Sequence, residues 1–352
     1  MRKTLKRTGI ALLCVAVVII IIAAAVFSNE IRSLVSIRRL DNYGMFQMTY
    51  YGDYGFDEFL KTGASGDGDI EEFIVRRLLK GLPVDLGITS GGCTVFVTRD
   101  ENGDIIYGRN FDFSYSPSMQ IVTKPKNGYA SISTVNLAFV GYSESKLPSG
   151  LNFKSFLTLA APFLPFDGMN EKGLAIASLA VPGTDPPPYD EGKITLNTTT
   201  AMRLVLDKAA TVDEAVELLK QYNIYFSGGI DCHFLAADAG GRSAIIEYYD
   251  GDMRVTPAGA PYQIASNFIA YNGLNIGEGY SEFERYDAVR NAIENNGGRL
   301  GEEQAAALLA EVGVRSEGED KLQWSVVYNL TALDGTIFAH RKSYAPVRFQ
   351  LN

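Results

Sequence analysis

A cysteine and a downstream arginine–aspartate pair are the residues of this sequence best suited to chemistry. Cys93 opens a run of β-branched and aromatic residues, and Arg109 and Asp112 follow it by 16 positions (93 to 109) and 19 positions (93 to 112). The dipeptide Asn102-Gly103 between them is a strong signal for a β-hairpin turn. A hairpin returns its second arm beside its first, so it would bring Arg109 and Asp112 close to Cys93. A guanidinium beside a thiol favours the nucleophilic thiolate, and the pattern therefore predicts nucleophilic catalysis.

The proton acceptor that such a cysteine needs is not evident among the histidines. His233 lies in an alternating strand pattern, which predicts a packed core residue, and His340 lies near a hairpin end, where we expect it to be solvated. A free α-amine, with a pKa of about 7.7–8.0, is suited to the task. This hypothesis requires cleavage between Gly92 and Cys93, so that one residue supplies both thiol and amine. The alternative is that Cys93 is a small buried hydrophobic residue, as most single cysteines in strands are.

Composition excludes several classes of function. The net charge of −9 argues against nucleic acid as a partner, because phosphate binding needs a basic face. Three cysteines do not make a disulfide framework, and two histidines without paired cysteines make a zinc site improbable. We expect neither a metal nor a cofactor.

The N-terminus predicts a membrane anchor. Residues 9–27 form an uninterrupted apolar run, close to the roughly 20 residues that span a bilayer as a helix. Basic residues precede the run, so residues 1–28 are expected to be a cytoplasmic tip and a single-pass anchor, with the remainder outside the cytoplasm. The alternative is a cleaved signal peptide and a secreted protein, although the apolar core of such a peptide is usually only about 7–15 residues long.

The remaining chain divides into a pro-segment, residues 29–92, and a domain, residues 93–352. Helical patterns are expected at 69–80, 198–208, 212–222, 280–295 and 302–312. Strands are expected on both sides of several hairpin turns, and also at 137–142 and 262–268, whereas 166–173 is expected to be a polar turn without chemistry. Strand pairs with helices gathered in blocks predict an α+β fold with antiparallel sheets.

Residues 90–345 resemble the N-terminal-nucleophile (Ntn) linear amide C–N hydrolases, namely the choloylglycine hydrolase family and its acid ceramidase-like relatives. The spacing of Cys93 to the Gly-Arg-Asn-Phe-Asp segment matches the pattern of that family. Further matches are the turn Asp167–Leu174 with its Asn-Glu-Lys-Gly-Leu end, the hairpin residues Asp238, Gly241 and Glu247, the strand end at Asn267, and the late arginine Arg285.

The resemblance implies a four-layer αββα sandwich and autocatalytic cleavage before Cys93. It implies that Arg109 holds the thiolate, that Asp112 orients the α-ammonium group and that Asn267 stabilises the oxyanion, with Arg285 as a further site residue. The bile-salt branch carries an asparagine where this chain has Ala180, so the sequence leans toward the ceramidase-like branch, in which long pro-segments are found.

The expected substrate is a small N-acyl amide. Two alternatives stay open, namely an acyltransferase of the same architecture and a non-catalytic, membrane-tethered binding domain. The sequence does not indicate an oligomeric state.

Overall fold

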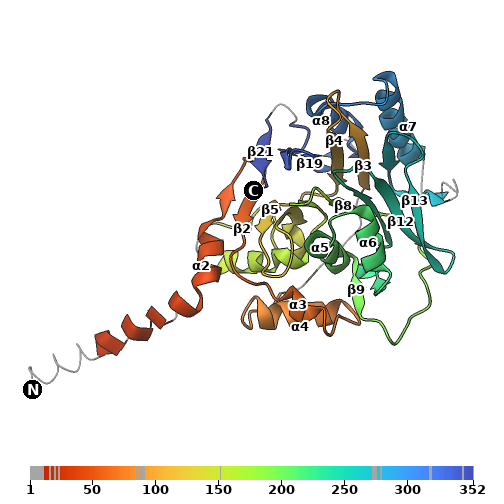
Figure 1. The fold of residues 1–352 in the computed structure, drawn as a ribbon. Helices are drawn as coiled ribbons and strands as arrows, with labels where there is room; N and C mark the ends of the chain where they lie inside the picture. The colour runs from red at the N-terminus through yellow and green to blue at the C-terminus, as the bar shows by residue number, and fades with distance from the viewer. Residues whose placement is uncertain are drawn as a thin grey trace, which may run out of the picture.

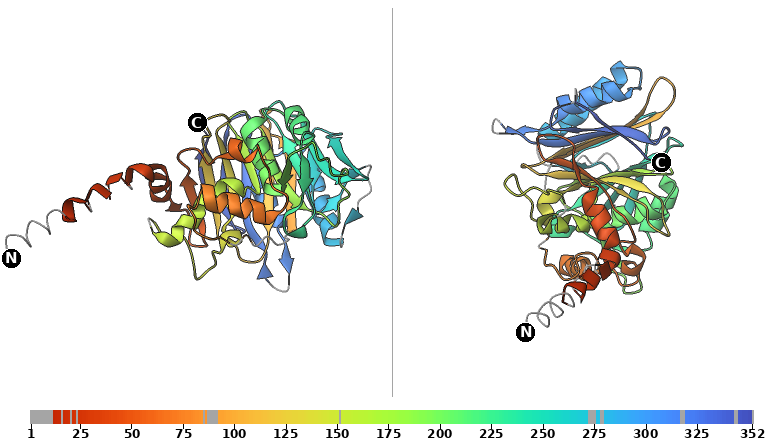
Figure 2. Two further views of the ribbon diagram at one scale, coloured as in Figure 1. Left: turned by 90° about the horizontal axis from the view of Figure 1, so that it is seen from below. Right: turned by 90° about the vertical axis from the view of Figure 1, so that its left-hand side faces the viewer.

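The structure is a computed structural model. It describes residues 12–15, 17–19, 21–22, 24–84, 86, 92–150, 152–271, 276–277, 280–316, 319–342 and 345–351. Two β-sheets stack face to face and helices cover both outer faces, which gives four layers in the order αββα (Figures 1 and 2).

The larger sheet has nine strands, and its central strands alternate between the two cores that they separate. Their order across the sheet is β1 (Arg38–Arg39), β2 (Met45–Thr49), β5 (Ser118–Thr123), β6 (Ser131–Asn136), β7 (Asp167–Asn170), β8 (Ala175–Ala180), β11 (Cys232–Ala237), β12 (Ser243–Tyr249) and β13 (Asp252–Pro257). In β11, Phe234 packs toward the helices and Leu235 toward the other sheet, as the two-residue period of a strand requires.

The smaller sheet has six strands and carries the predicted hairpin. Its order is β14 (Gln263–Ala265), β3 (Gly92–Arg99), β4 (Ile105–Asp112), β19 (Leu322–Asn329), β20 (Asp334–Ala339) and β21 (Val347–Gln350). The apolar core between the two sheets includes Cys93, Phe111 and Trp324.

Helices close the sandwich on each side. Over the outer face of the larger sheet lie α2 (Ser28–Val35), α3 (Phe56–Phe59), α4 (Asp67–Arg77), α5 (Thr198–Lys208), α6 (Val212–Leu219) and the 3-10 segment η2 (Phe153–Phe163). Over the smaller sheet lie α7 (Tyr280–Asn295) and α8 (Glu302–Val312). The helices expected at 198–208, 280–295 and 302–312 are confirmed with the same bounds, while those expected at 69–80 and 212–222 are shorter in the structure.

The segment before Cys93 is part of the larger sheet rather than an appendage to it. Strand β2 pairs with β5 in parallel, with Met45 opposite Ser118, so the expectation of purely antiparallel sheets is wrong at this point. A parallel pair needs a long crossover connection, and the intervening chain, which includes the whole β3–β4 hairpin, supplies it. From the same segment, the side chains of Phe59, Ile70 and Ile74 are fully buried.

Three local expectations are wrong. Residues 137–142, expected as a strand, form the 3-10 turn η1 (Leu137–Val140), which Asn136 caps by accepting a hydrogen bond from the Ala138 N–H. Residues 262–268 form two strands, β14 and β15 (Phe268–Ile269), with a break between them. Residues 167–170, expected within a turn, form strand β7 in the middle of the larger sheet.

The N-terminal helix projects away from the body of the molecule (Figure 2). Within the part of the chain that the structure describes, no helix alone is long and apolar enough to cross a membrane. The helices Leu12–Val26 and Ser28–Val35, which meet at a bend of 73°, satisfy the length and composition together. Residues 1–11 of the expected anchor and basic tip lie outside the described residues.

Candidate active site

The β3–β4 hairpin brings the predicted nucleophile and its arginine together. Gly92 pairs with Asp112 and Cys93 with Phe111 across the two strands. Cys93 is 3% exposed, and its Sγ lies 3.7 Å from Nη2 of Arg109. The hairpin expected from Asn102-Gly103 is therefore confirmed, and its second arm is longer than the sequence suggested.

Arg109 is completely buried beside the sulfur and is held from several sides. Its Nε lies 3.1 Å from Oδ2 of Asp167, and its Nη2 donates to the carbonyl oxygens of Phe166 and Ser178 at 3.4 and 3.3 Å. Burial lowers the pKa of the Arg109 guanidinium, but the charges of Cys93 and Asp167 more than offset this, and the pKa is raised. The guanidinium stays charged, and this fixed positive charge favours the thiolate form of Cys93.

Asp167 is a candidate site residue that the sequence analysis missed. Its carboxylate is fully buried and accepts hydrogen bonds from Trp324 Nε1 at 2.9 Å and from the Tyr328 hydroxyl at 2.7 Å, both from β19. Together with Arg109 it forms a buried ion pair between the two sheets. The available signal was the aspartate that opens the family-like turn at 167–174, which the sequence analysis interpreted as a polar turn without chemistry.

Asn267 lies at the break between β14 and β15, and the break directs its side chain at Cys93. The backbone N–H of Cys93 donates to Asn267 Oδ1 at 2.6 Å, and Asn267 Nδ2 donates to the carbonyl oxygen of Ala180 at 2.8 Å. The neighbouring Ser266 hydroxyl donates to the carbonyl oxygen of Cys93 at 3.3 Å. A carboxamide nitrogen carries two hydrogens, so Asn267 has a second N–H besides the one directed at Ala180.

Arg285 reaches this cluster from α7. Its Nη1 lies 3.0 Å from Asp112 Oδ2 and 3.0 Å from the Thr94 hydroxyl, and its Nη2 donates to Asn267 Oδ1 at 3.1 Å. Asp112 also accepts the backbone N–H of Val314 at 2.8 Å. The structure thus brings Cys93, Arg109, Asp112, Asn267 and Arg285 together, as the sequence analysis expected.

Within the part of the chain that the structure describes, neither histidine forms a hydrogen bond with the thiol. The fully buried His233 shares a hydrogen bond of 2.9 Å with Glu247, which confirms the prediction of a core residue. His340 is half-buried rather than solvated, and its Nδ1 lies 2.8 Å from the Leu322 carbonyl oxygen. Among the described residues, no group of three histidine, cysteine or acidic side chains is arranged to hold a metal ion.

Aromatic side chains surround the nucleophile on its inner side. Phe111 stacks on Trp324 with ring centroids 4.1 Å apart, and the guanidinium carbon of Arg109 lies 5.1 Å from the Phe111 ring centroid. Phe113 and Phe166 are half-buried and pack against the same cluster. A site with a thiol, two guanidinium groups, a carboxamide and apolar walls is equipped to attack an acyl carbonyl and to stabilise the resulting oxyanion.

The part of the chain that carries this site is similar in sequence to known proteins. A family model described as linear amide C–N hydrolases, choloylglycine hydrolase family, matches residues 93–292, which is more than half of the chain. A bile salt hydrolase/transferase of Clostridium perfringens is 27% identical over 225 residues, covering 59% of this chain and 66% of that protein. A penicillin V acylase of Pectobacterium atrosepticum is 37% identical over 114 residues, covering 29% of each. The chain thus spans slightly less than two thirds of the first of these relatives.

Solved structures agree on the fold. A variant of the conjugated bile acid hydrolase from Clostridium perfringens superimposes with a TM-score of 0.52 at 18% identity, covering 70% of this chain and 89% of that one. A second variant of the same enzyme gives 0.50 with the same coverage. The Ntn-hydrolase sandwich expected from the sequence is therefore confirmed. The chain belongs to the choloylglycine hydrolase family of linear amide C–N hydrolases.

Proposed function

We propose that this protein hydrolyses small N-acyl amides with an N-terminal cysteine that it exposes by cleaving its own chain before Cys93. The observation that carries the proposal is the 3.7 Å approach of the buried Arg109 guanidinium to the Cys93 sulfur, within a cluster that also contains Asn267 and Asp112. A buried salt bridge alone would not need a thiol at its edge.

Cleavage uses the thiol of Cys93 on the peptide bond that precedes it. The sulfur attacks the carbonyl carbon of Gly92, the C–N bond to Cys93 breaks, and the freed nitrogen takes the thiol proton. Water then hydrolyses the thioester, which leaves a carboxylate on Gly92 and a free amine on Cys93. The glycine has no side chain to obstruct this approach.

Turnover repeats the same chemistry on the substrate. The α-amine of Cys93 accepts the thiol proton, and the thiolate attacks the amide carbonyl. The second N–H of Asn267 stabilises the oxyanion, and one such donor is typically worth about 2.7–4 kcal/mol. The ammonium group of Cys93 returns its proton to the departing amine, and water cleaves the thioester to release the acid.

Intact-mass analysis of the Cys93→Ala variant tests the proposal. We expect the wild-type chain to break between residues 92 and 93, and the variant to remain whole and inactive toward amide substrates. Normal cleavage or turnover by the variant would refute the assignment. A folded wild-type protein that never acquires an N-terminus at Cys93 would favour a non-catalytic binding domain.

Acyl transfer is a second candidate, because the name of the Clostridium perfringens relative includes a transferase activity. In that reaction an amine, rather than water, accepts the acyl group from the thioester on Cys93. Product analysis with and without an added amine distinguishes the two reactions. Formation of a new amide at the expense of free acid would establish transfer.

We further propose that residues 29–92 stay bound after cleavage. Support comes from strand β2, which pairs with β5 along five residues, and from the burial of Phe59 and Ile74 in the core beneath the larger sheet. Fully burying one such side chain contributes about 1.5–3 kcal/mol, so several together resist dissociation. Both fragments should therefore elute as one species in size-exclusion chromatography without denaturant. Separate elution of the two would contradict this.

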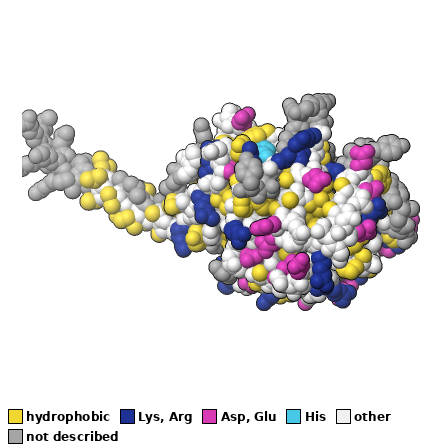
Figure 3. Space-filling model, turned by 90° about the horizontal axis from the view of Figure 1, so that it is seen from above, with side chains coloured by type: hydrophobic (Ala, Val, Ile, Leu, Met, Phe, Trp, Pro, Cys, Tyr) yellow, Lys and Arg dark blue, Asp and Glu magenta, His cyan; other side chains and the backbone are white. Residues whose placement is uncertain are grey.

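The N-terminal helix is proposed to anchor the protein in a membrane, with the catalytic domain outside the cytoplasm. Its support is the exposure of apolar side chains along Leu12–Val26, including Leu12 at 67% and Val26 at 68% (Figure 3). Such exposed apolar area is unfavourable in water and favourable in lipid. Membrane fractionation tests the proposal, since an anchored protein resists extraction by high salt and carbonate but yields to detergent. A mature chain that begins after residue 27 would instead indicate a secreted protein.

A further inference from the structure

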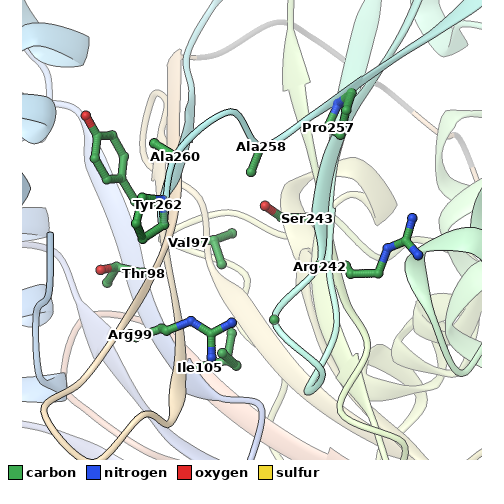
Figure 4. A pocket seen from close by; sticks show the side chains of 12 residues that line it. Val97, Thr98, Arg99, Ile105, Arg242, Ser243, Pro257, Ala258, Ala260 and Tyr262 are labelled. Carbon is green, nitrogen blue, oxygen red and sulfur yellow. The ribbon is translucent and has the colours of Figure 1, made fainter.

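A cavity lies at the opposite end of strand β3 from the nucleophile. It has a volume of about 310 Å³ and is formed where the β3–β4 hairpin meets the strands β12 and β13 and the loop that follows them (Figure 4). Cys93 and Arg99 are six residues apart in β3, which corresponds to about 20 Å along a strand. The cavity is therefore separate from the site described above.

Arg99 supplies the positive charge of this cavity. Among the residues that the structure describes, none forms a hydrogen bond or an ion pair with its guanidinium, although the side chain is half-buried. Asp100 is the acidic residue next to Arg99 in the sequence. Its carboxylate accepts hydrogen bonds from the Asp104 backbone N–H and from the Asn102 side-chain amide. A half-buried guanidinium without a carboxylate partner is unusual in a chain with a net charge of −9.

The turn of the β11–β12 hairpin holds the guanidinium in place. Gly241, at φ +85°, lets Arg99 Nη2 lie directly against its backbone, where a β-carbon would collide with the guanidinium. The same hypothetical β-carbon would lie 3.1 Å from Ile105 Cδ1, so Arg99 is confined between the turn and the hairpin. A guanidinium confined in this way loses little conformational entropy when it binds an anion.

Two other polar residues of the cavity, Ser243 and Arg242, point in different directions. The Ser243 side chain, from a residue that is 6% exposed, points toward the cavity, and its hydroxyl has no hydrogen-bond partner among the described residues (Figure 4). Arg242 also lines the cavity but turns away from it, and its Nη1 lies 2.7 Å from Asp213 on α6. The apolar part of the wall includes Val97, Ala258 and Pro261. Thr98 also lines the cavity, and its hydroxyl donates to the carbonyl oxygen of Gly298 at 3.0 Å.

We propose that this cavity binds a small monocarboxylate with an apolar chain. Arg99 would receive the carboxylate through paired N–H donors, the Ser243 hydroxyl would donate a further hydrogen bond, and the apolar wall would cover the chain. One confined guanidinium matches a single carboxylate, because its two parallel N–H groups fit the two oxygens. The volume lies at the lower end of the range for small-molecule sites, which limits the ligand to a short chain.

Hexanoate is the probe for the test, and 1-hexanol and inorganic phosphate are the comparison ligands. In calorimetric titrations of the wild-type protein we expect hexanoate to bind with a dissociation constant on the order of 1 mM or tighter. Hexanol lacks the charge and phosphate lacks the apolar chain, so both should bind much more weakly. Equal binding of phosphate and hexanoate, or no binding of hexanoate, would overturn the proposal.

Variants locate the binding. Arg99→Gln should weaken hexanoate binding by about tenfold or more, whereas the matched control Arg242→Gln, from the same wall, should bind as the wild type does. An Arg99→Gln variant that binds normally would place the acid elsewhere, for example at Cys93, and refute the site. Ser243→Ala keeps the charge and the fold and should weaken binding several-fold. Unchanged affinity in Ser243→Ala would refute the geometry even if Arg99→Gln did not fold.

Discussion

Replacing Arg109 with glutamine is the sharpest test of the thiolate argument. Its Nη2 lies 3.7 Å from Cys93 Sγ, and at an effective dielectric constant of about 20 a full charge at that distance is worth about 4.5 kcal/mol. This corresponds to about 3 pKa units at most. Removing the charge should therefore raise the pKa of the Cys93 thiol and slow its reactions as a nucleophile at neutral pH.

The single substitution also leaves the buried carboxylate of Asp167 without its cation. Breaking one partner out of a buried ion pair typically costs about 3–5 kcal/mol of stability, which would confuse the measurement. The double variant Arg109→Gln/Asp167→Asn removes both charges. The carboxamide that it introduces at position 167 can still form hydrogen bonds with Trp324 and Tyr328. Because the opposing charge of Asp167 is lost as well, we expect the thiol pKa to rise by a smaller amount than removal of the Arg109 charge alone would give.

The assay is the rate of alkylation of Cys93 by iodoacetamide as a function of pH, with the modified residue identified by peptide mass spectrometry. Because the ammonium group freed by cleavage would itself favour the thiolate, the profiles are compared between wild type and variant in the same state of processing, as checked by intact mass. The midpoint of the rate profile should shift upward in the double variant, and cleavage at neutral pH should slow in parallel. A folded double variant with an unchanged midpoint would refute the idea that Arg109 favours the thiolate.

Two further predictions follow from packing and burial. Gly108→Ala places a β-carbon 2.5 Å from Cζ of the fully buried Phe96 and should destabilise the fold by about 1–3 kcal/mol, whereas Gly259→Ala, with nothing within 4 Å, should leave the urea midpoint almost unchanged. Equal midpoints for the two variants would contradict the packing argument. Burial, and secondarily the charge of Cys93, raises the pKa of the Cys232 thiol, so that thiol is protonated at neutral pH. We therefore expect iodoacetamide to alkylate Cys232 far more slowly than Cys93. Equal alkylation rates for the two thiols would contradict this prediction.

The elements that the sequence predicts well carry local signals. Helix α5 begins where Asn197 accepts the N–H of Thr200, and α6 begins where Thr211 accepts the N–H of Glu214, so side-chain caps fix both starts. The β3–β4 turn needs a residue with positive φ, and Gly103 provides it at +94°. In each case a few neighbouring residues determine the geometry, and the prediction needs no knowledge of the rest of the chain.

The parts of the site that local sequence patterns do not specify depend on contacts between residues far apart in the chain. Arg285 joins the cluster only because α7 packs across β3 and β14, which no pattern within α7 specifies. In the sequence, Asp167 belongs to a stretch with the composition of a polar turn. In the structure its two carboxylate oxygens accept hydrogen bonds from Trp324 and Tyr328 of the other sheet. A buried carboxylate of this kind becomes evident only when its partners, about 160 residues later in the chain, are known.

Two buried ion pairs lie on either side of the reacting residue. Arg109–Asp167 directs its guanidinium at the sulfur of Cys93, whereas Asp112, paired with Arg285, lies opposite Gly92, on the side where cleavage would free the nitrogen. Each pair is neutral as a whole, so their effect depends on orientation. A cation near the sulfur, together with the Asn267 oxygen that accepts the Cys93 N–H, favours the thiolate–ammonium form over the thiol–amine form. In the proposed mechanism that form is the one produced when the amine takes the thiol proton, so the same arrangement would serve each attack by Cys93 on a substrate once the nitrogen is free.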